Sequence, residues 1–211
     1  ATLQESADMM LEAFDLADRY RTPVFIVSDG MLGQMMEPVE FKRKNRRKPI
    51  AKEWAAVGHE GKRARNVVKT LYLDPEKLEE HNNNLQQKYR LIEANEAHSE
   101  ILNLADAEVV VAAYGSTSRI VKNGMEILAE LGIKTGIIRP LTLWPFDRSG
   151  FEQIPGSCKA VLCVEMSCGQ MVEDVRLAVN GRLPVVFYGR SGGVVPTPAE
   201  IVEQVRMLVG R

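Results

Sequence analysis

The stretch VVVAAYGSTS, residues 109–118, joins a continuous apolar run to a turn of small residues. Val109–Ala113 has the composition of a strand that is buried on both faces, as in a parallel sheet. Tyr114–Ser118 is predicted as a loop that leads from this strand into a helix. A strand, a loop and a helix in this order indicate an α/β unit.

The sequence after this stretch repeats the alternation. The order predicts a mostly parallel sheet with right-handed crossovers, and residues 104–211 are expected to form one Rossmann-like three-layer domain. The next helix is predicted to point Ile120, Val121, Gly124, Ile127, Leu128 and Leu131 inward and to end at Gly132. Further expected elements are strands at Lys134–Ile138, Ala160–Val164 and Pro184–Phe187, a long apolar loop at Arg139–Asp147, and helices at Met171–Val179 and after Thr197-Pro198, with Glu200 completing a capping box.

The first 40 residues predict only the end of another α/β domain. Thr2 and Glu5 have the spacing of a capping box, and Val24–Val27 has the composition of a buried strand. A single helix–strand unit cannot bury its own faces, so we expect a missing partner, either upstream sequence or another chain. The apolar positions of the expected helix are Leu3, Ala7, Met10, Leu11, Phe14 and Ala17.

Residues 41–103 are expected to be a linker. The basic run Lys42–Lys48 could attract nucleic acid or an anionic cofactor such as coenzyme A, but a solvated linker is favoured because no other basic face supports it. Asp74 and Pro75 predict the start of a long helix that extends from about Glu76 to about Glu100.

Composition excludes several classes of protein. The formal net charge of −1 argues against a dedicated nucleic-acid binder. No apolar run has membrane-spanning length, and no signal peptide is visible. Three Cys suit a reducing cytoplasm better than a disulfide framework.

Two places at strand ends could carry chemistry. The loop Gly115, Ser116, Thr117 and Ser118 could bind an anion at a helix N-terminus, although a tight turn with a helix cap is favoured. Glu165, with Gln170 near it, lies where open α/β sheets have their crevices. A cofactor or partner contact and a backbone-capping role are equally open for this pair.

Neither Cys nor His residues show a recognisable metal or catalytic pattern. The spacing of Cys158, Cys163 and Cys168 matches no iron–sulfur motif, so ordinary buried or half-buried thiols are expected. His59, His81 and His98 show no spacing typical of metal ligands, and they are expected to be solvated or capping residues.

Several stretches together resemble the alpha-type subunits of 2-oxoacid:ferredoxin oxidoreductases. Ser167 departs from the family pattern, because many members carry Asn there, so a contact made by that Asn cannot be carried over. Thr70–Glu76 and the helix after it look most like the branched-chain subgroup, which acts on 2-oxoisovalerate. The stretches that carry the resemblance are Pro23–Gly33, Val111–Ser116, Arg139–Phe146, Val164–Gln170, Tyr188–Gly193 and Thr197–Ile201.

The resemblance implies an oxidative decarboxylation with thiamine diphosphate and Mg²⁺, acyl transfer to coenzyme A, and electron transfer through iron–sulfur clusters to ferredoxin. The family's activating Glu and its substrate contacts lie upstream of the matched region. No catalytic residue, no metal ligand and no cofactor bound to this chain alone are therefore expected. Residues 1–40 would end the pyrimidine-binding domain, and residues 104–211 would resemble the transketolase C-terminal domain.

The implied partners are a thiamine-diphosphate-binding beta subunit, a gamma subunit, a ferredoxin-like delta subunit and ferredoxin. The edge formed by Gly115–Ser118 and Glu165 is expected to face a partner. Two alternatives remain open: a subunit of a transketolase or 2-oxoacid dehydrogenase, and a non-catalytic module that binds a nucleotide or coenzyme A.

Overall fold

A computed structural model describes residues 1–41 and 50–210, so the basic run Lys42–Lys48 lies outside the described residues. Its centre is a five-stranded sheet in the order β1-β3-β2-β4-β5. All neighbouring strands are parallel except β1, which is antiparallel to β3. The predicted α/β class and its mostly parallel sheet are confirmed. The elements are α1 (Leu3–Tyr20), α2 (Pro75–Glu96), β1 (Ser99–Leu102), β2 (Val109–Ala112), α3 (Gly115–Glu130), β3 (Thr135–Pro140), α4 (Ser149–Glu152), β4 (Ala160–Glu165), α5 (Met171–Val179), β5 (Val185–Gly189) and α6 (Pro198–Val209).

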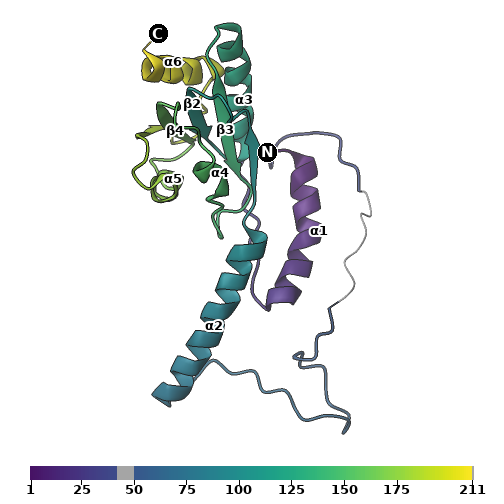
Figure 1. The fold of residues 1–211 in the computed structure, drawn as a ribbon. Coiled ribbons are helices and arrows are strands. Elements are labelled where there is room, and N and C mark those ends of the chain that lie inside the picture. The colour runs from purple at the N-terminus through teal and green to yellow at the C-terminus, as the bar shows by residue number, and fades with distance from the viewer. Residues whose placement is uncertain (42–49, 211) are drawn as a thin grey trace.

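Helices cover both faces of the sheet and give the three predicted layers (Figure 1). Val109 and Val111 point to the face that α3 and α6 cover, and Val110 and Ala112 point to the face that α4 and α5 cover. Both sets are fully buried, as expected of a strand inside a parallel sheet. Two apolar cores therefore stabilise the domain, one on each side.

The order of the strands creates a switch point between β2 and β4. The chain leaves β2 through α3 toward β3, on one side, and returns through α4 to β4, on the other. Loops diverge at such a point and leave a crevice beyond the carboxyl ends of the strands. Tyr114, after β2, and Glu165, at the end of β4, both lie at this edge.

The long helix α2 starts as predicted, with Asp74 as N-cap and Pro75 at the first position. Its predicted end near Glu100 is wrong, because α2 stops at Glu96 and Ser99–Leu102 forms strand β1 on the open edge of β3. Pairing with β3 satisfies backbone groups that a longer helix would leave on an exposed sheet edge. The range predicted as linker thus contributes a strand to the sheet.

The helix α1 has the predicted capping box of Thr2 and Glu5. Only Ala13 and Tyr20 of its 18 residues are buried. The apolar side chains Met10, Leu11 and Phe14 are exposed. Figure 1 shows the same arrangement, with α1 standing beside the three-layer domain instead of inside it.

The strand predicted at Val24–Val27 does not form among the described residues. This segment has no strand beside it, and Phe25 is 85% exposed. A run of this composition becomes a strand only when neighbouring strands and a covering layer are present.

Two further details differ from the prediction. The predicted loop Gly115–Ser118 is the first turn of α3, because the helix begins directly after Tyr114. Ile127 and Leu131 were expected to point inward, but both are exposed. The inner face of α3 is formed instead by small and apolar residues such as Val121, Gly124 and Leu128. In the part of the chain that the structure describes, no helix has the length and hydropathy of a bilayer-crossing segment.

Candidate functional site at the carboxyl edge of the sheet

Three loops meet at the carboxyl edge of the sheet. The first follows β2 at Tyr114, the second follows β4 at Glu165, and the third follows β5 at Gly189. The backbone N–H of Arg190 donates to the carbonyl of Glu165 at 3.1 Å, which ties the second and third loops together. The structure thus brings the predicted candidate residues of α3 and of the Glu165 turn to one edge.

The N-terminus of α3 already holds an anion, and that anion is the carboxylate of Asp29. The hydroxyl of Ser116 donates to Asp29 Oδ2, and the backbone N–H of Leu32 donates to Asp29 Oδ1 at 2.8 Å. Gly115 has φ of 56°, and a Cβ built there would lie 3.8 Å from the same carboxylate. A helix N-terminus favours such a negative charge.

The surroundings of Asp29 keep it ionised. Burial opposes the charge, but hydrogen bonds from Ser116 and from backbone N–H groups outweigh it and lower the pKa of Asp29. Burial, together with the nearby Glu165 carboxylate, raises the pKa of Tyr114. The edge therefore combines a fixed carboxylate with a neutral phenol.

The other candidates in this first turn face their own helix. Ser118 Oγ donates to the carbonyl of Gly115 at 2.6 Å, and Ser118 and Thr117 are both buried. The Ser118 hydroxyl thus bonds back to its own helix, and α3 has no side-chain cap bond at its N-cap residue, Tyr114. Asp29 was not predicted from the sequence as a site residue. The turn Ser28-Asp29-Gly30, which follows an apolar run, could have indicated a polar side chain at a strand end.

Glu165 is 1% exposed and caps the N-terminus of α5. The backbone N–H of Val172 donates to Glu165 Oε1 at 2.9 Å, and that of Met171 donates to Oε2 at 3.0 Å. The N–H of Gln170 and the hydroxyl of Ser167 also donate to this carboxylate. Of the two roles that the sequence left open, the structure shows backbone capping. Gln170 is the residue that precedes α5, and its side chain makes no cap bond.

A second polar junction fixes α1 to the sheet through Arg139. This guanidinium is 6% exposed, and it donates to Glu5 at 2.6 and 3.1 Å and to Glu100 at 2.6 Å. Lys122 of α3 donates to the same Glu100 at 2.8 Å. Arg139 was predicted in a loop, but it lies in β3. The sequence did contain a signal for these ion pairs. Arg139 is the one charged residue within the apolar run Ile137–Leu141, and a charge that is buried with such a run needs an oppositely charged partner.

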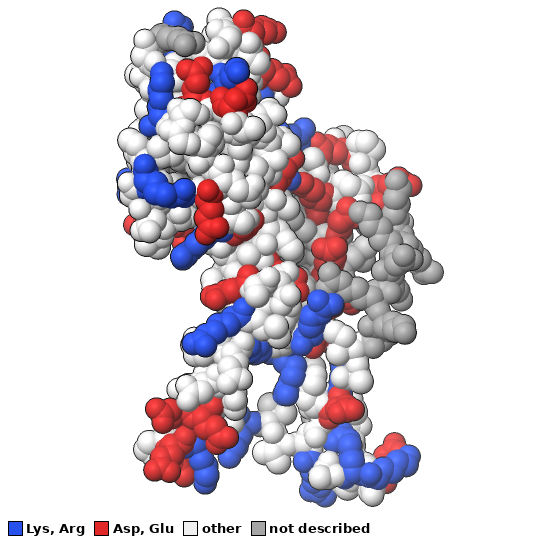
Figure 2. All heavy atoms as spheres, in the orientation of Figure 1, with Lys and Arg blue, Asp and Glu red and all other residues white. Residues whose placement is uncertain are grey.

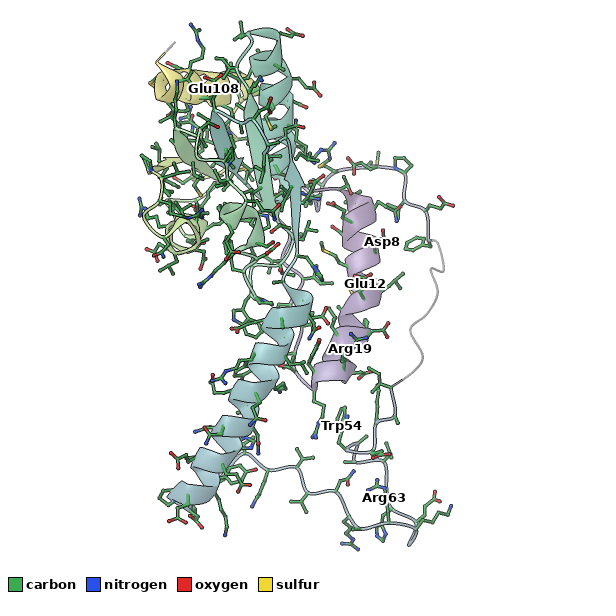
Figure 3. The ribbon with its side chains drawn as sticks, viewed as in Figure 1. Asp8, Glu12, Arg19, Trp54, Arg63 and Glu108 are labelled. Atoms are coloured by element: carbon green, nitrogen blue, oxygen red, sulfur yellow. The ribbon has the colours of Figure 1, made fainter. Side chains whose placement is uncertain are left out.

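The far end of α1 is fixed in a similar way. The hydroxyl of Tyr20 donates to Glu96 Oε1 at 2.6 Å, and both residues are buried. Arg19, labelled in Figure 3, also contacts Glu96, at 3.4 Å. Trp54 lies below this end of α1, with Arg21 4.7 Å from its ring centroid. Polar contacts at its two ends thus hold α1, whereas much of its apolar surface stays exposed.

The cysteines and histidines do not come together. Cys158 and Cys163 are buried and Cys168 is exposed. Burial raises the pKa of Cys158 and of Cys163, so both thiols stay protonated. His81 stacks on Tyr72, and His59 accepts a hydrogen bond from the N–H of Gly61. Among the described residues, no group of three or more His, Cys, Asp or Glu side chains could hold a metal ion.

The two carboxylates at the sheet edge are engaged within the chain. Asp29 accepts from the Ser116 hydroxyl at the N-terminus of α3, and Glu165 accepts from the N–H of Val172 at the N-terminus of α5. A shallow surface hollow lies on α6. It is lined by Ala199, Val202, Glu203, Arg206 and Met207.

The chain thus combines a three-layer α/β domain with a helix, α1, whose large apolar side chains are exposed. Residues 1–107 match the family described as "Pyruvate flavodoxin/ferredoxin oxidoreductase, thiamine diP-bdg", and residues 107–201 match "Pyruvate:ferredoxin oxidoreductase core domain II". The chain belongs to this oxidoreductase family.

Individual relatives support the branched-chain subgroup within the family. The chain is 38% identical over 211 residues to the ketoisovalerate oxidoreductase subunit VorB of Methanothermobacter thermautotrophicus, which covers 100% of this chain and 59% of the relative. It is 26% identical to the 2-oxoglutarate synthase subunit KorA of Methanothermobacter marburgensis, over 97% of this chain and 61% of the relative. The chain thus spans about three fifths of the length of these relatives. The resemblance seen in the sequence is confirmed.

A solved structure supports the fold. The 2-oxoglutarate:ferredoxin oxidoreductase from Magnetococcus marinus, with 2-oxoglutarate, coenzyme A and succinyl-CoA bound, matches with a TM-score of 0.57. The match has 24% identity and covers 65% of this chain and 24% of that chain.

Proposed function

We propose that this chain forms part of the alpha-type subunit of a 2-oxoacid:ferredoxin oxidoreductase that oxidatively decarboxylates 2-oxoisovalerate. The observation that carries the proposal is the 38% identity to a ketoisovalerate oxidoreductase subunit along the whole chain. The reaction converts the 2-oxoacid and coenzyme A to acyl-CoA and CO₂, and ferredoxin takes up the two electrons. Thiamine diphosphate stabilises the carbanion left by decarboxylation.

In this proposal the chain itself has a structural role. Asp29 and Arg139 join the first 40 residues to the sheet, and Glu165 fixes the edge near that junction. Mg²⁺, iron–sulfur clusters and ferredoxin belong to other parts of the complex, as do the beta, gamma and ferredoxin-like delta subunits. The edge at Gly115–Ser118, Glu165 and Gln170 would pack near one of these parts, with its carboxylates already hydrogen-bonded within the chain.

The exposed apolar surface supports a role in assembly. Large side chains on α1 and in the following segment, including Phe14 and Phe25, are exposed. Contiguous exposed apolar patches usually mark an interface. The runner-up hypothesis, a self-sufficient module that binds a nucleotide at Gly115–Ser118, is disfavoured because Asp29 occupies that helix N-terminus.

The proposal is tested by anaerobic purification of the complete subunit with its natural partners. Viologen or ferredoxin reduction is then measured with 2-oxoisovalerate, 2-oxoglutarate and pyruvate, each with and without coenzyme A. We expect reduction that depends on coenzyme A and is fastest with 2-oxoisovalerate. A preference for 2-oxoglutarate would overturn the substrate. Activity with lipoamide instead of ferredoxin would place the chain in a 2-oxoacid dehydrogenase.

A further inference from the structure

The helix α2 projects away from the three-layer domain (Figure 1). Its buried residues, Ile92 and Glu96, lie near the end that meets the sheet. At the other end, every residue from Asp74 to Glu80 is exposed, and Figure 2 shows acidic atoms gathered there. A charged, exposed end is what a helix presents to water, so the direction of α2 is set at the end that meets the sheet.

A single residue separates α2 from the part of the chain that is bonded to the sheet. The backbone N–H of His98 donates to Thr142 Oγ1 at 3.0 Å, and its carbonyl accepts from the N–H of Leu141 at 2.9 Å. These two bonds attach His98 to the loop that follows β3. Ala97, between Glu96 and His98, ends the helix with extended backbone angles. A change in the backbone angles of one such residue is enough to redirect a whole helix.

The helix α1 is bonded to α2 just before this junction. The hydroxyl of Tyr20 donates to Glu96 Oε1 at 2.6 Å, and both side chains are buried. Lys88, two turns earlier in α2, donates to the carbonyl of Arg21 at 3.4 Å. A buried hydrogen bond to a carboxylate is among the stronger ones, so the Tyr20 contact is the main attachment.

The other end of α1 is bonded to the sheet. Buried Arg139 of β3 donates to Glu5 at 2.6 and 3.1 Å and to Glu100 of β1 at 2.6 Å. Glu5 and Tyr20 are separated by about 22 Å along the helix, at 1.5 Å per residue. The helix α1 therefore reaches past the junction at Ala97 and is bonded to the chain on both sides of it.

We propose that α1 is a splint that fixes the direction of α2 relative to the sheet, with Ala97 as the hinge. A contact between Tyr89 and Trp144, whose ring centroids are 5.8 Å apart, supports α2 from the loop after β3. Loss of either attachment of α1 leaves α2 with this edge contact and the linkage at Ala97, so that a range of directions becomes accessible. The inference rests on these contacts and not on the substrate of the enzyme.

Double electron–electron resonance between nitroxide labels in the complete subunit tests the proposal. The labels are attached at Glu79→Cys, on the exposed end of α2, and at Glu126→Cys, on an exposed position of α3, in a Cys168→Ser background. We expect one narrow distance distribution for the otherwise unchanged subunit. Tyr20→Phe should about double the width of this distribution, because it removes the hydroxyl that bonds Glu96.

Glu5→Gln is the decisive variant, because Glu5 bonds Arg139 and the residues that precede its own helix. Gln at this position keeps the capping box of α1 but loses the charge that pairs with Arg139. We expect the α2 distribution to broaden by about 1.5-fold or more, although the substitution lies about 22 Å along α1 from the contact with α2. Tyr72→Phe, which removes a hydroxyl from the segment before α2, is the control and should leave the width unchanged.

Broadening with only one of the two variants would overturn the splint, since both attachments are needed to transmit the direction of the sheet to α2. A distribution that is already broad in the unchanged subunit, or a width that neither variant changes, would also overturn it. Circular dichroism confirms that each variant is folded. If Tyr20→Phe does not fold, Glu5→Gln decides alone.

Discussion

The Glu165 carboxylate is buried, and it accepts hydrogen bonds from the backbone N–H groups of Gln170, Met171 and Val172 as well as from the Ser167 hydroxyl. A carboxylate at a helix N-terminus is stabilised by the helix dipole and by the N–H groups that it accepts from. Glu165→Gln keeps the size and shape of the side chain but replaces one carboxylate oxygen with an NH₂ group, which cannot accept a hydrogen bond. One or more backbone N–H groups then lose their acceptor. We expect a loss of about 1–3 kcal/mol in the free energy of unfolding, measured by urea denaturation.

The matched control for this substitution is Glu173→Gln, in the first turn of the same helix and exposed. It should change the unfolding free energy by less than about 0.5 kcal/mol. Equal effects at the two positions would show that Glu165 contributes no more than a surface charge.

Gly189 lies where the end of β5 passes close to the Ser167 turn. A Cβ built there would be 2.4 Å from the carbonyl oxygen of Ser167 and 2.3 Å from Phe187 Cζ. The ring can move, but the backbone oxygen is fixed by the turn that Glu165 holds. Gly189→Ala should therefore destabilise the domain by about 1–3 kcal/mol in thermal or urea unfolding. Gly156→Ala is the control, because nothing lies within 4 Å of its built Cβ.

At the scale of residues, the sequence predicted where a residue lies in its strand or helix better than it predicted which residue it contacts. Glu165 was predictable as a residue at a strand end because the preceding run, Ala160–Val164, has the pattern of a buried strand. Asp29 and Arg139 were missed because each acts on a group far along the chain, Ser116 and Glu5 respectively. Periodicity and motifs report local conformation, whereas such pairs depend on the packed fold.

At the scale of elements, the attachment of α1 to β3 is predicted to depend on pH. Burial raises the pKa of Glu5, but hydrogen bonds from Arg139 and the amino group of Ala1 outweigh it and lower the pKa from 4.5 to about 2. A carboxyl group whose pKa is lower in the folded state stabilises the fold above its unfolded pKa, and this contribution is lost as the pH falls toward its folded pKa.

Glu5→Gln should accordingly lower the Tm by a constant amount above pH 5. The difference in Tm from the unchanged chain should shrink between pH 4.5 and about pH 2. Scanning calorimetry across this range measures it. Glu12→Gln, on an exposed position of the same helix in Figure 3, should show no such dependence. A Tm difference for Glu5→Gln that is independent of pH would contradict the role of Arg139.

The elements that sequence predicted best are those with local signals at their ends. Capping boxes marked α1 and α6, and Asp74-Pro75 marked α2. The strand predicted at Val24–Val27 was wrong for this chain, since strand formation needs a neighbour that the described residues do not supply. β1 was missed because its four residues pair with β3 across a separation of about 40 residues, beyond the reach of any local pattern.

At the scale of the whole molecule, the exposed apolar residues of the first 40 positions are predicted to be covered in the complex. Phe25→Glu should reduce co-purification of the partner subunits with the complete subunit by about tenfold, since burial of a charge opposes association. Leu177→Glu, at an exposed apolar position on α5, is the control and should leave co-purification unchanged. Quantitative mass spectrometry of the purified complex provides the measurement. Equal recovery with both variants would contradict a covered Phe25.

The overall class of the molecule was predictable because alternating strands and helices restrict the topology strongly. The placement of α1 beside the domain was not predictable. Its apolar face predicted a buried helix, whereas a few ion pairs and hydrogen bonds hold it in place.

The helix α2 has the proportions of a lever, since it is long and its buried residues lie near one end. Its 22 residues correspond to about 33 Å at 1.5 Å per residue, and its anchored end is at Ile92 and Glu96. A tilt of about 10° at that anchor displaces the far tip by about 6 Å, given this helix length. A small shift at the Tyr20–Glu96 contact that tilts the helix by this angle would thus move the far tip of α2 by more than the distance between two paired strands. Spin labels at the two ends of α2 would read out this amplification as a distance distribution.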